Sequence, residues 1–61
     1  MNTTTTWEVT WAGCLFPFEC RTEAEALMRA RRITNHTVWV DRVYCGSRRQ
    51  IAEYNYGTRV A

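Results

Sequence analysis

The side chains best suited to chemistry in this chain are three cysteines and a single histidine. Cys14, Cys20, Cys45 and His36 are ligands that zinc accepts, but no two cysteines form a C-x-x-C pair and His36 follows a predicted helix. No spacing places His36 beside a thiol, so a cysteine–histidine nucleophile has no support. The pattern predicts ordinary thiols with no metal and no cofactor. The odd number of cysteines favours a reducing compartment over a disulfide framework.

Other catalytic chemistry has no signature in the sequence. Three scattered glycines form no phosphate-binding loop, and the carboxylates are spread along predicted strands. A chain of 61 residues also leaves little volume for a concave substrate site. The sequence therefore predicts a protein that is not an enzyme.

The basic side chains indicate binding, but not of one particular partner. All eight positive residues are arginine, which either a GC-rich genome or selection for planar, bidentate hydrogen-bond donors would produce. The net charge of +2 is too small to indicate nucleic-acid binding by itself. No apolar run approaches the roughly 20 residues of a membrane span, so no membrane partner is expected.

The stretch VYCGSRRQIAEYNYG predicts a β-hairpin with arginines at its tip. A four-residue loop, Gly46–Arg49, is favoured because it places Arg42 opposite Glu53 and Tyr44 opposite Ile51. A three-residue loop would instead set two acidic side chains against each other. The tip has two interpretations: a soluble turn that discourages edge pairing, or a pair of arginines that enters an acidic groove of a partner.

This register divides the hairpin residues between two faces. The face predicted to point inward carries Trp39, Asp41, Val43, Cys45, Ala52, Tyr54 and Tyr56. The face predicted to point outward carries Val38, Val40, Arg42, Tyr44, Ile51 and Glu53. An outward face this apolar, with arginines beside it, indicates a partner surface or a homodimer interface. A slip of one residue would exchange the two faces.

A helix is predicted from about Thr22 to Thr34. Thr22 and Glu25 form a capping box, and EAEALMRARRIT is rich in helix-forming residues, with acids first and arginines last. One arc of the helix is apolar and is predicted to face the core: Ala26, Leu27, Ala30 and Ile33.

The remaining elements complete an α+β prediction. TWEVTWAG alternates as a half-buried strand does, and TVWVDRVYC is dense in β-branched and aromatic residues. The segment 15–19 reads equally as a strand or a loop, and its large apolar residues Leu15, Phe16 and Phe18 are expected to be covered. We predict a flexible N-terminus, 1–6, and one domain, 7–61, in which a single helix packs on one face of a small antiparallel sheet in the order β-α-β-β.

This layout resembles a class of small phage-encoded proteins. EAEALMRARRI followed by TVWV and a short hairpin, roughly residues 22–56, resembles β-α-β-β proteins of the anti-CRISPR type in pattern, size and basic helix end. The chain has NHT where such proteins often have glycine, and arginine where they have lysine, so no binding residue is carried over. The resemblance implies a compact binder without a cofactor, which blocks a host machine by occupying a surface.

The resemblance therefore implies a protein that inhibits a bacterial defence machine in the host cytoplasm by binding a host protein or ribonucleoprotein complex. Trp, Tyr and Arg are the residues that dominate interface hot spots. The predicted partner-binding residues are Arg42, Tyr44, Arg48, Arg49, Ile51 and Glu53. Two alternatives stay open: a sheet that binds RNA or single-stranded DNA, and a structural homo-oligomeric accessory protein.

Overall fold

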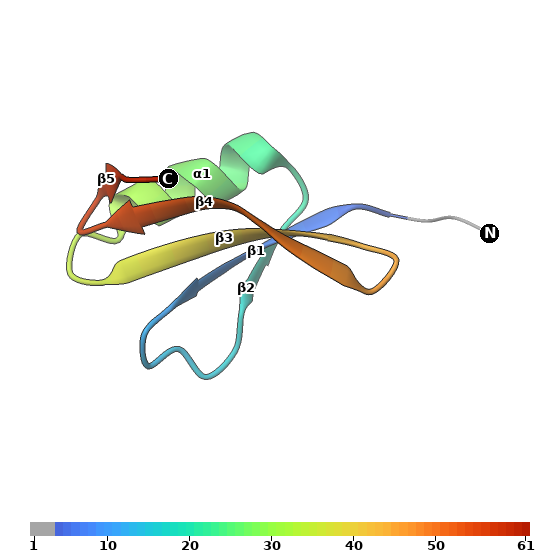
Figure 1. The fold of residues 1–61 in the computed structure, drawn as a ribbon, viewed down its shortest axis with the longest axis horizontal. Helices are drawn as coiled ribbons and strands as arrows, with labels where there is room; N and C mark the ends of the chain where they lie inside the picture. The colour runs from blue at the N-terminus through green and yellow to red at the C-terminus, as the bar shows by residue number, and fades with distance from the viewer. Residues whose placement is uncertain (1–3) are drawn as a thin grey trace.

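The computed structural model describes residues 4–61 and contains five strands and one helix in this part of the chain. The elements are β1 (Thr6–Trp11), β2 (Phe18–Cys20), α1 (Glu23–Arg32), β3 (Thr37–Tyr44), β4 (Ser47–Asn55) and β5 (Thr58–Arg59). The strands form one antiparallel sheet in the order β2-β1-β3-β4-β5. Figure 1 shows α1 lying along one side of this sheet, so the predicted α+β class is confirmed. No helix in the described residues is long and apolar enough to cross a membrane.

The sequence predicts that the folded domain begins at residue 7. Residues 1–3 of the predicted flexible segment lie outside the described part of the chain. Thr6 already belongs to β1, where it pairs with Val43 of β3.

The helix begins where the sequence predicts it. Thr22 is the N-cap, and its Oγ1 accepts a hydrogen bond from the backbone N–H of Glu25 at 3.2 Å. Such a cap satisfies one of the donors that a helix N-terminus leaves unpaired. The helix ends at Arg32 with Ile33 as its C-cap, slightly before the predicted end at Thr34.

The predicted inner face of the helix is also confirmed. Ala26 and Ala30 are fully buried, which lets the helix backbone approach the sheet closely. Leu27 and Ile33 flank them, half-buried, and pack against the core. The fully or nearly fully buried core residues come from four strands and the helix: Val9, Cys20, Ala26, Ala30, Val38, Val40, Ala52 and Tyr54.

The predicted register of the β3–β4 hairpin is wrong. Tyr44 pairs with Ser47, so the loop has two residues, Cys45 and Gly46, rather than four. Both have positive φ, 50° and 79°, as a type I′ turn requires. Primed turns match the right-handed twist of paired strands, and this backbone preference outweighs the favourable side-chain pairs on which the four-residue prediction rests.

A β-bulge adds a second departure from the predicted register. The pairing shifts between Val40 and Asp41, because Val40 faces Ala52 while Asp41 faces Gln50. Ile51 of β4 lies between these two pairs and has no partner on β3, and one such unpaired residue defines a bulge. The predicted pairs Arg42–Glu53 and Tyr44–Ile51 therefore do not form.

The inner and outer faces of β3 are exchanged relative to the prediction. Val38 and Val40 point toward the helix and are fully buried, whereas Trp39, Asp41 and Val43 lie on the face away from it. The predicted exposed Val-Val patch is therefore part of the core.

On β4, the predicted inward positions of Ala52 and Tyr54 are confirmed, since both are buried. Two other predicted inward residues, Cys45 and Tyr56, lie exposed in turns instead.

The segment 15–19 contains both alternatives that the sequence left open. Residues 12–17 form a loop, and β2 begins at Phe18, which pairs with Val9. The expectation that the large apolar residues here are covered is wrong. Leu15 is 87% exposed and Phe16 is 80% exposed.

A second turn of the same backbone type joins β4 to β5. Tyr56 and Gly57 have φ of 50° and 89°, and Asn55 pairs with Thr58 across the turn. A Cβ at Gly57 would lie 3.2 Å from the carbonyl oxygen of Arg31, so glycine is needed for this turn to pack against the helix end.

Candidate partner-binding surface

The turn end of the β3–β4 hairpin is exposed and carries charged side chains. Figure 1 shows this turn toward one end of the long axis, beyond the N-terminal end of α1 and opposite the β4–β5 turn. Every residue from Tyr44 to Gln50 is exposed. The end of the hairpin therefore has two accessible faces: one continuous with the helix side of the sheet, and one on the open side.

The helix-side face of this tip carries three residues of the predicted partner-binding set. Arg42 and Arg49 are direct cross-strand partners, and Tyr44 follows on the same face with 47% of its surface exposed. Together with Cys45 and Ser47 they line a shallow hollow of about 430 Å³. We call Arg42, Tyr44 and Arg49 the basic tip face.

Neither arginine of the basic tip face is neutralised. Within residues 4–61 the ion pairs are Arg29 with Glu25 and Arg48 with Glu8. Like charges placed directly opposite each other in a sheet are destabilising. The fold therefore concentrates uncompensated positive charge at this site.

The open-side face of the tip has the opposite character. Glu8 on β1 lies between Glu19 of β2 and Asp41 of β3 in register, which makes a row of three carboxylates across the sheet. Arg48 lies on this face and neutralises part of the row, because both of its terminal nitrogens donate to the carboxylate of Glu8, one at 3.4 Å. The hairpin end is thus basic on one side, and acidic or internally paired on the other.

The structure separates the six residues predicted to bind a partner together. Arg42, Tyr44 and Arg49 share one face, but Arg48 and Glu53 lie on the other. Ile51 stands at the bulge, half-buried and packed against the core, and its carbonyl oxygen accepts a hydrogen bond from Arg59 at 3.3 Å. The predicted register brought four of them to one face, and it placed Arg48 and Arg49 in the loop at the tip beside that face.

The thiols and the histidine do not converge. All three cysteines are free, and the residues from 4 onward contain no cluster of His, Cys, Asp or Glu that could hold a metal ion. His36 stacks on Trp11 with ring centroids 6.5 Å apart. Burial, and to a lesser degree the nearby Glu25, raise the pKa of the Cys20 thiol, which makes it a weak nucleophile.

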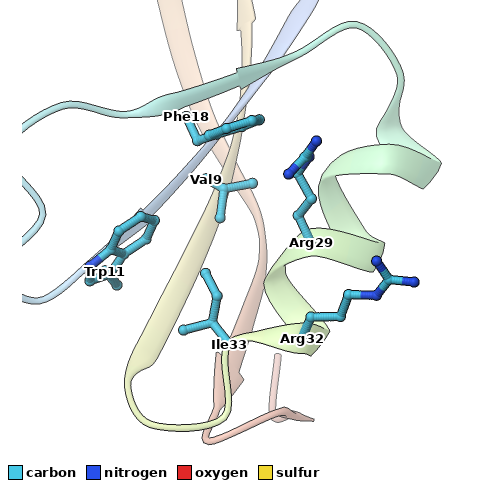
Figure 2. A pocket seen from close by; sticks show the side chains of 6 residues that line it. All are labelled: Val9, Trp11, Phe18, Arg29, Arg32 and Ile33. Atoms are coloured by element: carbon cyan, nitrogen blue, oxygen red, sulfur yellow. The ribbon is translucent and has the colours of Figure 1, made fainter.

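A second hollow, which sequence reasoning missed, lies between α1 and the β1–β2 hairpin. Figure 2 shows its lining, with two aromatic walls on one side and two arginines of the helix on the other. Its volume is about 250 Å³, and it is lined by Val9, Trp11, Phe18, Arg29, Arg32 and Ile33. The guanidinium carbon of Arg29 lies 4.2 Å from the centroid of the Phe18 ring, a cation–π contact. The apolar run CLFPF was the one signal in the sequence that could have indicated this site.

Comparison with known proteins finds no matching family model, no matching curated protein and no matching solved structure. Function must therefore be argued from the two surfaces themselves.

Proposed function

We propose that this chain is a non-enzymatic binding protein whose basic tip face covers an acidic surface of a protein partner. In the role that the sequence pattern suggests, the partner is a component of a bacterial defence machine, which the protein inhibits by occupying a surface that the machine needs. No metal or cofactor takes part in this mode of action.

The observation that carries the proposal is the direct pairing of Arg42 with Arg49. A cross-strand pair of like charges works against folding, and a single acidic residue at either position would remove the repulsion. An anionic partner removes it as well, because each guanidinium gains a bidentate carboxylate acceptor. Tyr44 beside the pair adds a ring with a hydroxyl group, a side chain frequent at interface hot spots.

The distribution of charge favours a protein partner over nucleic acid. A hairpin that enters a groove of a duplex faces phosphates on both sides, and here the other side carries Glu8, Glu19 and Asp41 in a row. A protein surface contacts only one side, which matches the two-sided charge of this hairpin. The partner we propose presents carboxylates over an area about as wide as two strands.

Single-stranded RNA or DNA is the second candidate. One observation favours it: an exposed tyrosine stands beside two unpaired arginines, an arrangement that can stack a base and bind its phosphates. The experiment must therefore distinguish protein from nucleic acid.

The test compares three immobilised proteins in bacterial lysate: the parent, the double variant Arg42→Ala with Arg49→Ala, and a control double variant. Arg21→Ala with Arg31→Ala is the matched control, because it removes the same charge from exposed sites elsewhere on the surface. We expect the parent and the control to retain a protein that the tip variant does not, with or without nuclease treatment. Association with the captured partner should also slow as salt increases.

Two results would contradict the proposal. Equal capture by the tip variant at both low and high salt would mean that the basic tip face is not the binding surface. Capture that disappears with nuclease would identify nucleic acid as the partner.

A further inference from the structure

The β1–β2 hairpin combines a largely apolar hollow with exposed apolar side chains on the loop that joins its two strands. The hollow has Trp11 and Phe18 as walls, and the loop that joins these two residues carries Leu15 and Phe16. Leu15 and Phe16 are the most exposed of the large apolar residues in the described part of the chain. We call these four residues together with Ile33 the β1–β2 patch.

The patch exposes several large apolar side chains. Phe16 is 80% exposed and Phe18 is 42% exposed. Because an aromatic side chain can bury about 150–250 Å², the two rings alone expose on the order of 250 Å² of apolar surface. Leu15 and the walls of the hollow add to this. Large apolar side chains exposed near one another on a soluble protein are frequent at interaction sites.

We propose that the β1–β2 patch binds a second copy of this chain in a symmetric dimer, in which Phe16 of each copy enters the hollow of the other. A two-fold interface uses the same surface on both partners, so that surface must contain both the inserted group and its acceptor. Here both lie on one hairpin and the adjoining helix end. A volume of about 250 Å³ suits a single aromatic side chain, whereas sites for drug-sized ligands span roughly 300–1,000 Å³.

The surroundings of the hollow agree with this occupant. An inserted phenyl ring would contact Trp11 and Phe18. Aromatic pairs of this kind contribute to the binding free energy beyond what their buried area provides. Arg29 and Arg32 stand at the margin, and Arg29 is already paired with Glu25 at 3.5 Å. The result is an apolar centre with charged groups around it, as in most protein interfaces.

The exposed area indicates a weak dimer. Two copies contribute on the order of 500 Å² from their phenylalanines, and Leu15 and the covered walls must supply the rest of the interface. Stable interfaces begin at roughly 1,200 Å² of total buried surface, and smaller ones belong to weak or transient complexes. The basic tip face stays outside the dimer because it lies at the other end of β1.

The first measurement is the molar mass of the full chain by sedimentation equilibrium across the micromolar range. The mass should rise from 7.2 kDa toward twice that value. Phe16→Ser should raise the dimer dissociation constant at least about tenfold, because a central aromatic is a typical hot spot. Since Phe16 is exposed in the monomer, the circular dichroism spectrum of the Phe16→Ser variant should match that of the parent. Val60→Ser is the matched control: it removes another exposed apolar side chain, far from the patch, and should leave dimerisation unchanged.

The second measurement locates the contact. In a mixture of isotope-labelled and unlabelled protein, filtered nuclear Overhauser spectra should show the Phe16 ring of one copy close to the methyl groups of Ile33 in the other. Because the contact is apolar, added salt should not weaken the dimer.

A monomer at every concentration would overturn the proposal, as would a dimer that Phe16→Ser does not weaken. Intermolecular contacts that exclude Phe16 would place the interface elsewhere. Saturation of the hollow by an acidic peptide in a salt-dependent manner, without any dimer, would identify an acidic protein segment as the occupant instead. None of these results bears on the basic tip face, whose variants are tested separately.

Discussion

Replacing Val40 by alanine should be far more costly than replacing Val43, although the two valines belong to the same strand. Val40 is fully buried beneath the helix, whereas Val43 is half-buried on the open side of the sheet. The two-residue turn and the bulge produce this difference. The pair of substitutions therefore tests the register and the assignment of faces together.

The magnitude follows from the buried groups. Val→Ala deletes two methyl groups, worth about 0.8 kcal/mol each when buried. A cavity that does not collapse fully adds to this loss, so Val40→Ala should lower the free energy of unfolding by about 2–3 kcal/mol. A domain of this size has a total stability of roughly 3–9 kcal/mol, so the loss is a large fraction of the whole. Val43→Ala, which removes only partly buried surface, should cost less than about 1 kcal/mol.

The assay is urea and thermal unfolding of both variants followed by circular dichroism. The melting temperature of the Val40 variant should fall by roughly 10–20 °C, and that of the Val43 variant by a few degrees. An equal or larger loss for the Val43 variant would refute the reasoning, because the face predicted from the sequence to point inward, which carries Val43 and not Val40, gives that reversed order.

Three further substitutions and one change of pH test local features of the hairpin and core. Arg49→Glu should raise the free energy of unfolding at low salt by about 0.2–1 kcal/mol, since it turns a repulsive cross-strand pair into an attractive one. Arg48→Glu should lower it, because that arginine is paired with Glu8; urea midpoints at two salt concentrations measure both. Cys45→Gly should stabilise the protein by up to about 1 kcal/mol in thermal melts, because a residue with a Cβ is strained at a φ of 50°. The pKa of the Cys20 thiol is raised, so the folded state holds this proton more tightly than the unfolded chain does. The contribution of this thiol to the free energy of unfolding is therefore fully present below the ordinary thiol pKa of 9.0, and it should fall as the pH rises above that value. Urea titrations on either side of that pH would check the trend, and a rise in stability would contradict it.

The features that could be predicted from the sequence are those set by neighbouring residues. The cap at Thr22 depends on Glu25 three positions later, and the buried positions of Ala26 and Ala30 follow from helical periodicity. These interactions lie within one or two turns of helix, so local sequence is enough to define them.

The hairpin register could not be obtained in the same way, because the pairing preferences of side chains conflicted with the preference of the backbone. A signal was nevertheless present. Cys45-Gly46 and Tyr56-Gly57 are both residue–glycine pairs between strand-like segments, and both form two-residue turns with positive φ. Giving such pairs priority over favourable charge pairing would have placed Tyr44 opposite Ser47 and Arg42 opposite Arg49. The position of Val38 and Val40 on the same face as Ala52 depends on the bulge as well.

The bulge and the two short strands have no comparable local signal. β2 has three residues and β5 has two, and each exists because a longer strand offers it hydrogen-bonding groups. The division of the predicted binding residues into two faces follows directly from the bulge and the turn. A one-residue change in pairing decides which side chains can contact the same partner.

The strand order also bears on how this chain acquires its structure during synthesis. β1 is near the start, yet one of its two neighbours is β3, which is translated only after the loop, β2 and the helix. Until β3 is translated, Val9 and Trp11 are outside the ribosome but lack most of the core side chains that Val9 contacts in the folded protein. Leu15 and Phe16, which are exposed even in the folded protein, emerge at the same stage. Such non-local pairings form slowly and expose apolar segments to aggregation and to chaperones. We expect the β3–β4 hairpin, closed by the short turn at Cys45 and Gly46, to form before β1 pairs with β3 and to offer β1 an edge on which to dock.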